Sequence, residues 1–295
     1  MSRVYCSDAA RLRGDDNTAT AARIDVWLLV ELPITWGRDP ITEAALPQVV
    51  RDALRRASHE IPRCRVVFIR KRVECLGPTR VYIVRSGPRT GVTQLDLDSL
   101  DDVASVPFVS IANDTGAPAA RPIVLVCTHG QHDSCCGRRG YPLFDALRRR
   151  EELDLWQCSH IGGDRFAANA VVLPWGIYYG PVEPRDADEL AESIARDEIF
   201  LPGYRGRSSM SRPVQAAETF IRRETNVLAR DAFRLVSREP LENGRVQVHL
   251  RDRSGAIHDV TVEQFQSAET AMLTCTSETA STVPQFRLVE YKRPI

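Results

Sequence analysis

The sequence lacks an excess of charge of either sign and lacks any long hydrophobic run. Lysine and arginine together number 39, as do aspartate and glutamate, so the formal net charge is zero. A chain without positive excess has no general attraction for nucleic acid or for an anionic membrane. No run of about eighteen apolar residues occurs, so we expect no transmembrane helix. We therefore expect that neither nucleic acid nor a membrane is a partner.

Several familiar motifs are also missing. The chain has no glycine-rich nucleotide loop, no flavin fingerprint and no Cys-x-x-Cys at a helix start, and residues 1–25 lack the apolar core of a signal peptide. The 8 cysteines are few for a disulfide scaffold in a chain of 295 residues, and four of them lie between 127 and 158. Without an export signal, such clustering indicates metal binding or thiol chemistry. We therefore expect a reducing, cytoplasmic setting.

The apolar pattern predicts an α/β (α+β) protein. Strands are expected at 25–32, 64–72, 80–87, 122–127 and 153–160, helices at 41–61, 141–150 and 186–200, a turn at 76–79 and a hairpin at 170–180. Beyond residue 200 we expect a linker-like loop (204–213), a helix (214–233), turns at 242–244 and 254–255, and a last strand (286–295). The order strand, loop, helix, strand, hairpin, helix over 122–200 is that of a thioredoxin-like unit.

The candidate chemistry is concentrated in two short stretches. CTHGQHDSCCG (127–137) holds three cysteines, two histidines and an aspartate, and CSHIGGD (158–164) adds a further cysteine, histidine and aspartate. Two adjacent glycines let the backbone turn sharply, which brings His160 and Asp164 to the same side. In a strand Cys158 and His160 share a face. These residues could hold a metal or exchange disulfides.

Four stretches together resemble the thioredoxin-like ferredoxins of the sucrase/ferredoxin-like family. They are 127–137, 156–180, 204–218 and, as the amino-terminal signature, 27–40. The resemblance implies a 2Fe–2S cluster with two cysteine and two histidine ligands. The family's cysteines match Cys127 and Cys136, and the first histidine of its His-x-Gly-Gly-His pattern matches His160. Asp164 stands where the second histidine is expected.

The departure at residue 164 leaves several ligand sets open. Asp164 is our first choice as the fourth ligand, since ferric iron accepts oxygen donors, and its charge would lower the reduction potential. Cys158 or Cys135 are alternative ligands, or the site keeps only the scaffold. Two cysteines, a histidine and an aspartate would also suit Zn²⁺. A thiol oxidoreductase using Cys135 and Cys136 is a further alternative, although adjacent cysteines close only a strained ring.

The resemblance implies an iron–sulfur electron-transfer protein, a carrier rather than an enzyme, with a reductase or an electron acceptor as its redox partner. We expect an amino-terminal α/β part (1–110), a thioredoxin-like ferredoxin domain (111–204) and a carboxy-terminal helix and β-rich region (205–295). His129 and His132 are interpreted as loop residues, and Cys6 as an ordinary core or surface residue. Cys275, Arg205 and Arg207 are left without a role.

Overall fold

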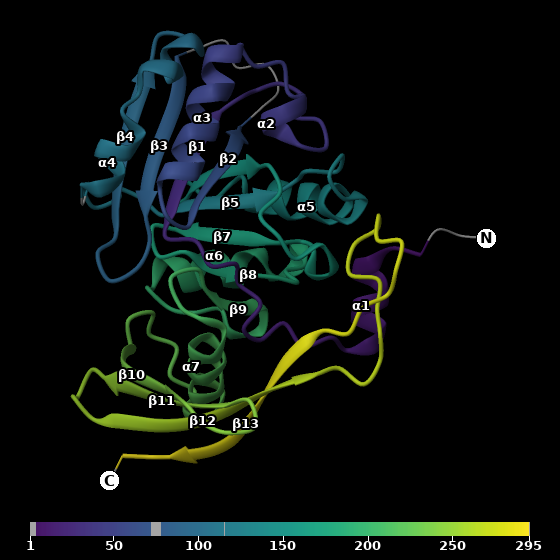
Figure 1. Ribbon diagram of the computed structural model, residues 1–295, viewed down its shortest axis with the longest axis vertical. Helices are drawn as coiled ribbons and strands as arrows, with labels where there is room; N and C mark the ends of the chain where they lie inside the picture. Colours follow the sequence, from purple (N-terminus) through teal and green to yellow (C-terminus); the bar gives the residue numbers. More distant parts are fainter. Residues whose placement is uncertain (1–3, 72–77, 115, 295) are drawn as a thin grey trace.

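The computed structural model describes residues 4–71, 78–114 and 116–294 (Figure 1). The first nine strands are β1 (Val26–Glu31), β2 (Cys64–Arg70), β3 (Thr79–Arg85), β4 (Gly91–Leu97), β5 (Ile123–Cys127), β6 (Asp154–Cys158), β7 (Ala170–Leu173), β8 (Ile177–Tyr179) and β9 (Tyr204–Arg207). The carboxy-terminal strands are β10 (Phe233–Pro240), β11 (Arg245–Asp252), β12 (Ile257–Gln266) and β13 (Pro284–Lys292).

The α-helices are α1 (Cys6–Arg13), α2 (Pro40–Glu43), α3 (Gln48–Glu60), α4 (Phe108–Asn113), α5 (Ser134–Leu147), α6 (Ala187–Ala195) and α7 (Arg212–Thr225). Short 3₁₀ helices are η1 (Asp101–Ser105), η2 (Asp164–Phe166), η3 (Pro184–Asp186) and η4 (Leu201–Gly203). The strands form a 9-stranded sheet, β4-β3-β1-β2-β6-β5-β7-β8-β9, and a 4-stranded antiparallel sheet, β10-β11-β12-β13. The α/β class expected from the sequence is confirmed.

The large sheet contains the same arrangement twice. In the order β2-β1-β3-β4 and again in β6-β5-β7-β8, the first two strands in sequence are parallel around a helix, and the third and fourth are antiparallel. This is the strand order of the thioredoxin fold. The two units meet where β2 pairs antiparallel with β6, at Ile69 and Arg70. The two units therefore share one continuous sheet, although we placed a domain boundary between them, at residue 110.

Strand β5 occupies the centre of the second unit and is buried on both faces. Val124 and Val126 pack with α5 and α6 on one face, while Leu125 and Cys127 pack with Trp156 on the other. Successive side chains of a strand point to opposite faces, so an entirely apolar run is what a strand covered on both sides requires. Trp156, Tyr178 and Tyr179 are almost completely buried and are core aromatics.

Three elements differ from those predicted. The helix expected over 41–61 is two helices, because α3 begins only after Pro47. The helix expected at 141–150 starts earlier, at Ser134, since the side chain of Asp133 accepts a hydrogen bond from the Cys135 N–H and caps it. The prediction of a loop at 204–213 is wrong for residues 204–207, which form β9 at the edge of the large sheet. The turn expected at 76–79 lies largely outside the described residues.

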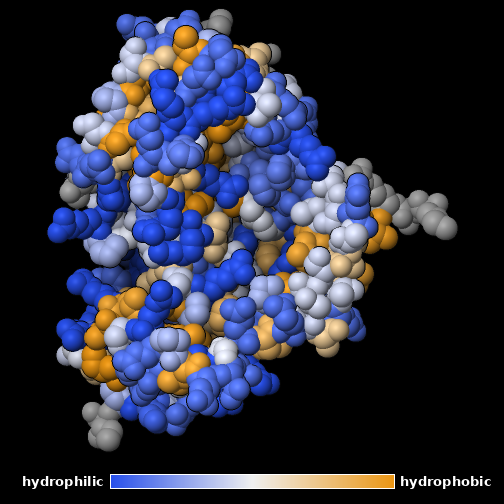
Figure 2. Space-filling model, in the orientation of Figure 1, coloured by the Kyte–Doolittle hydropathy of each residue, from blue (hydrophilic) through white to orange (hydrophobic). Residues whose placement is uncertain are grey.

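The carboxy-terminal region is a helix packed on a sheet, and its two hairpin turns are confirmed. Helix α7 contributes Val214, Ala217 and Ile221 to a core shared with Val248 and Val260. Apolar side chains also remain exposed on and beside the strands, as the orange areas over this sheet in Figure 2 show; they include Leu235, Val236, Leu241 and Val289. Among the described residues, none of the helices has the length and apolar character needed to cross a membrane.

Candidate metal centre

The first thiol of the site lies at the carboxyl end of β5. Strands β5 and β6 are parallel and in register, so that Cys127 lies directly opposite Cys158 at the same edge of the sheet. The side chains are almost completely buried, with 1% of Cys127 and 0% of Cys158 exposed. The two strand ends thus form the floor of a water-excluded site.

Helix α5 brings the second thiol to this floor. Its glycines allow a very close approach, because a Cβ atom on Gly140 would lie 1.9 Å from the carbonyl oxygen of Cys127. The helix start therefore lies directly against the strand end, and Cys136 is held beside Cys127. The ligand atoms of Cys127, Cys136 and His160 all lie within 4.8 Å of one another.

The loop after β6 supplies His160 and Asp164. Gly162 and Gly163 both have left-handed backbone angles (φ 99° and 89°), as the sharp turn expected here requires. His160 Nδ1 lies 3.1 Å from Asp164 Oδ1, and the Cys136 thiol donates to the same oxygen at 3.2 Å. The Cys136 Sγ to His160 Nδ1 distance is 3.9 Å. The structure thus brings together the four side chains that the sequence pointed to.

Arg205, which the sequence left without a role, holds this loop in place. Its buried guanidinium donates to the Gly162 carbonyl oxygen at 3.2 Å and to Asn169 Oδ1 at 2.6 Å, and it also binds Thr20. A Cβ on Gly163 would lie 2.3 Å from Arg205 Nη2, so only glycine leaves room for the arginine. The partners of Arg205 are distant in sequence, which is why local patterns did not reveal its function.

The two histidines of the 127–137 loop have different positions. His129 Nδ1 accepts the backbone N–H of His160 at 3.1 Å, and Nε2 contacts the Gly37 carbonyl oxygen at 2.5 Å, so both ring nitrogens of His129 are engaged. His132 stacks on His160 with ring centroids 3.8 Å apart. The ligand atoms of His132, His160 and Asp164 lie within 4.8 Å of one another. His132, which the sequence analysis interpreted as a loop residue, is therefore a further candidate ligand.

Hydrogen bonds and burial shift the pKa values of the side chains in the site. Hydrogen bonds from Cys136, Cys158 and His160 hold the pKa of Cys127 well below its usual range, although burial opposes this. The hydrogen bond to Cys127, together with burial, raises the pKa of Cys136. Burial alone would lower the pKa of His160, but Asp164 and Cys127 raise it to about 9. Such a buried set of anionic donors favours a cation, which replaces the shared protons when it binds.

The two alternative thiols are placed differently. Cys158 lies next to Cys127. Its pKa is raised mainly by burial and also by the hydrogen bond to Cys127. Cys135 lies outside the group, because its sulfur is 3.3 Å from that of Cys275 and 3.6 Å from that of Cys6. The structure therefore assigns Cys135 to another cluster.

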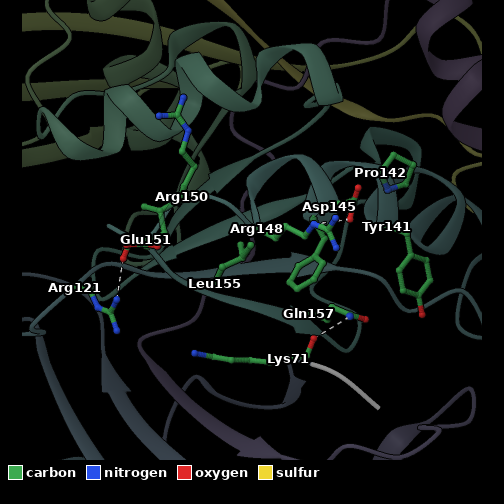
Figure 3. Close-up of a pocket in the computed structure, with 12 residues that line it drawn as sticks. Lys71, Arg121, Tyr141, Pro142, Asp145, Arg148, Arg150, Glu151, Leu155 and Gln157 are labelled. Atoms are coloured by element: carbon green, nitrogen blue, oxygen red, sulfur yellow. Dashed lines mark hydrogen bonds and ion pairs between the residues drawn. The ribbon is translucent and has the colours of Figure 1, made fainter. Parts of the chain in front are cut away.

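Solvent reaches the site on the histidine side. A pocket of about 350 Å³ is lined by His132 and His160 together with Arg38, Arg65 and neighbouring residues. A larger open pocket of about 1000 Å³ lies elsewhere, between α5 and β6 (Figure 3). In it, Gln157 donates a hydrogen bond to the Lys71 carbonyl oxygen and Arg148 pairs with Asp145, beside apolar side chains such as Leu155. Of these two pockets, the one at His132 and His160 is lined by residues of the site.

The fold and the site together define the class of protein. It is a thioredoxin-like protein with a buried site made of thiol, imidazole and carboxylate side chains. Residues 18–206 match the sucrase/ferredoxin-like family, and the chain belongs to this family. That match includes every residue of the site.

Similar proteins cover much less of the chain. "Altered inheritance of mitochondria protein 32" of Eremothecium gossypii is 30% identical over 106 residues, which are 31% of this chain and 34% of the relative. Its counterpart in Debaryomyces hansenii is 32% identical over 97 residues, 29% of this chain and 36% of the relative. The chain thus spans about a third of the length of these relatives. A thioredoxin-like [2Fe–2S] ferredoxin from Aquifex aeolicus has a TM-score of 0.26 and 23% identity, covering 29% of this chain and 91% of its own.

Proposed function

We propose that this protein is an electron carrier that holds a 2Fe–2S cluster on Cys127, Cys136, His160 and Asp164. The observation that carries the proposal is the convergence of these four side chains, from two strand ends, a helix start and a glycine turn, in one buried place. Thiolate and imidazole are established ligands of such clusters. A cluster bound here would take up and release one electron.

The surroundings of the site support this function. Thiolates and the Asp164 carboxylate concentrate negative charge in a water-excluded place, which would stabilise the oxidised state and lower the potential. His160 remains 16% exposed and lies at the opening next to His132. Electrons would therefore enter and leave on the histidine side, where a redox partner protein would meet charges of both signs, Arg38 and Arg65 with Asp39 and Glu43. A reducing, cytoplasmic setting would keep these thiols available as ligands.

A second candidate is a single Zn²⁺ ion. The donor atoms of Cys136, His160 and Asp164 are 3.1 to 3.9 Å apart. Donors around one tetrahedral zinc ion are separated by about 3.3–3.8 Å, given its bond lengths. Two irons would require the ligand pairs to move further apart.

The test is metal and spectroscopic analysis of the full chain purified without oxygen. A 2Fe–2S protein contains iron and acid-labile sulfide in equal amounts, is coloured, and gives an EPR signal after reduction with dithionite. Iron-free protein with one zinc per chain at this site would overturn the proposal and favour the second candidate. Colourless protein without either metal would refute both.

Three variants identify the fourth ligand. Asp164→Ala should weaken the reduced signal and Asp164→His should shift it, whereas His132→Ala should leave it almost unchanged. His59→Ala is the matched control, because His59 is exposed on α3, away from the site. If His132→Ala removes the cluster and Asp164→Ala does not, His132 and not Asp164 is the ligand.

A further inference from the structure

Three sulfur atoms from distant parts of the chain meet beside the start of α5. Cys6 is the first residue of α1, Cys135 lies in the first turn of α5, and Cys275 belongs to the segment 267–283 between β12 and β13. Their sulfur atoms form a triangle with sides of 3.6 Å (Cys6 to Cys135), 3.3 Å (Cys135 to Cys275) and 3.6 Å (Cys275 to Cys6). Figure 1 shows the yellow segment 267–283 lying beside the purple helix α1, far from its own sheet.

Asp133 completes a set of four donors. Its carboxylate oxygens lie 4.0 Å from the sulfur of Cys6, and ligand atoms of all four residues lie within 4.8 Å of one another. The carboxylate is fixed in position, because it accepts the backbone N–H of Cys135 at 2.8 Å and that of Cys275 at 2.6 Å. Each oxygen still has a lone pair to offer. Asp133 is buried, with 1% exposed.

The geometry suits one metal ion better than a disulfide. Sulfur atoms bound to one tetrahedral zinc ion are about 3.7 Å apart, given Zn–S bonds of about 2.3 Å. A disulfide would join only two of the three sulfurs at about 2.05 Å and would give the third no function. The Ser7 N–H also points to the sulfur of Cys135 at 3.5 Å, a contact that stabilises a metal-bound thiolate.

We propose that Cys6, Cys135, Cys275 and Asp133 bind a soft divalent cation, Zn²⁺ fitting best, as a structural site separate from the first centre. Three thiolates select zinc-like ions over magnesium or calcium, and four protein donors close the coordination sphere without leaving room for a substrate. On binding, the thiols release their protons to solvent and no oxidant is needed. No ligand is shared with Cys127, Cys136, His160 or Asp164.

The ion would add to the ion pairs of Asp8 with Arg138 and Arg139, which already join α1 to α5. The apolar cluster here consists of Cys6, Cys135 and Ala167, with Tyr5 and Cys275 packed against it. Within segment 267–283 the regular backbone pairing is the isolated bridge between Ala271 and Ser281. A closed zinc site contributes folding free energy directly, so it would fasten both α1 and this segment onto α5.

Cobalt binding tests the site in the full chain. In a background with both Cys127→Ser and Cys136→Ser, which removes both thiolates of the first centre, the metal-free protein should bind one equivalent of Co²⁺ with the intense visible bands of a tetrahedral thiolate complex. Adding Cys275→Ser or Cys6→Ser should remove or strongly weaken these bands. Cys64→Ser is the matched control and should keep them, because Cys64 lies at the start of β2. Bands that persist in both the Cys6 and Cys275 variants would overturn the proposal.

Proteolysis provides a second test that does not depend on variants at the cysteines. Glu269 and Glu278 are exposed within segment 267–283 and are targets for a glutamate-specific protease. A chelator should accelerate cleavage there at least several-fold in the protein with Cys127→Ser and Cys136→Ser, and Zn²⁺ should reverse the effect. Cleavage that is independent of both additions, or a disulfide among the three cysteines in freshly isolated zinc-free protein, would refute the site.

Discussion

Cys135 and Cys136 are consecutive residues of α5, yet their sulfur atoms belong to different groups. The Cys136 sulfur lies 3.2 Å from Asp164 Oδ1, whereas the Cys135 sulfur lies 3.3 Å from that of Cys275. Residues one apart on a helix point about 100° away from each other, so neighbouring thiols can serve two sites. This divergence argues against a vicinal disulfide between the two cysteines.

The pair of serine variants at these positions separates the two sites. Cys136→Ser should abolish the iron-dependent visible absorption of the anaerobically purified protein, because a proposed ligand is lost. Cys135→Ser should retain that absorption and lose zinc instead. Iron, sulfide and zinc analysis of both variants checks this. Loss of iron in both would mean that Cys135 serves the first centre.

Arg205→Met should destabilise the protein and disturb the first centre. The variant leaves the Gly162 carbonyl oxygen and Asn169 Oδ1 without their buried donor. Losing a hydrogen-bonded buried charge costs at least about 2 kcal/mol. We expect a lower unfolding free energy in urea and, in the folded protein, an altered EPR signal. An unchanged signal would show that Arg205 supports the fold alone.

Gly140→Ala should be far more damaging than Gly130→Ala. The new Cβ on residue 140 would meet the Cys127 backbone at 1.9 Å, whereas on residue 130 the nearest atom is Gly137 Cα at 3.4 Å, an ordinary contact. The first change must push α5 away from β5, at a cost of about 1–3 kcal/mol or more. Thermal unfolding and iron content measure both effects. Equal behaviour of the two variants would contradict the close helix–strand contact.

Glu218→Gln should cost about 3–5 kcal/mol, because it leaves buried arginines unpaired. Glu218 on α7 accepts from Tyr204 and Arg207 of β9 at 2.6 Å and 3.1 Å and from Arg222 at 2.9 Å, and so joins the carboxy-terminal helix to the large sheet. Urea unfolding at neutral pH measures the loss. Glu224→Gln is the control, since Glu224 is on the same helix but about half exposed.

The same network predicts a pH dependence. Burial opposes ionisation, but Arg207 and Arg222 outweigh it and lower the pKa of Glu218 below its ordinary value of 4.5. The stabilisation is therefore present above about pH 4.5 and is lost as the pH falls through the lower, folded-state pKa. Wild type should lose more stability than Glu218→Gln between pH 5 and the acid limit of folding, as urea titrations at several pH values would show. Parallel curves would contradict this.

A structural feature could be predicted from the sequence when the residues that determine it lie close together in the chain. Strand β5 and the glycine turn at 162–163 were predictable, because the apolar run and the paired glycines lie within a few residues of the side chains they position. The early start of α5 was also encoded locally, by Asp133 as its cap.

Other features had no local signal. Strand β9 was missed because Arg205 and Arg207 make it look like a polar loop, and the groups that neutralise them, such as Glu218, are distant in the chain or on another element. The cluster of Cys6 with Cys275 joins residues 269 positions apart, a separation that no pattern in one sequence reveals.

That separation has a consequence for how the protein is made. A chain is synthesised from its amino terminus, and its early parts fold first. Cys6 and Cys135 leave the ribosome before Cys275, so the sulfur triangle cannot close until residue 275 has been translated. A prematurely terminated product would carry two of the three thiols and no third. The contact between α1 and segment 267–283 thus separates a chain translated through residue 275 from one that stops before it.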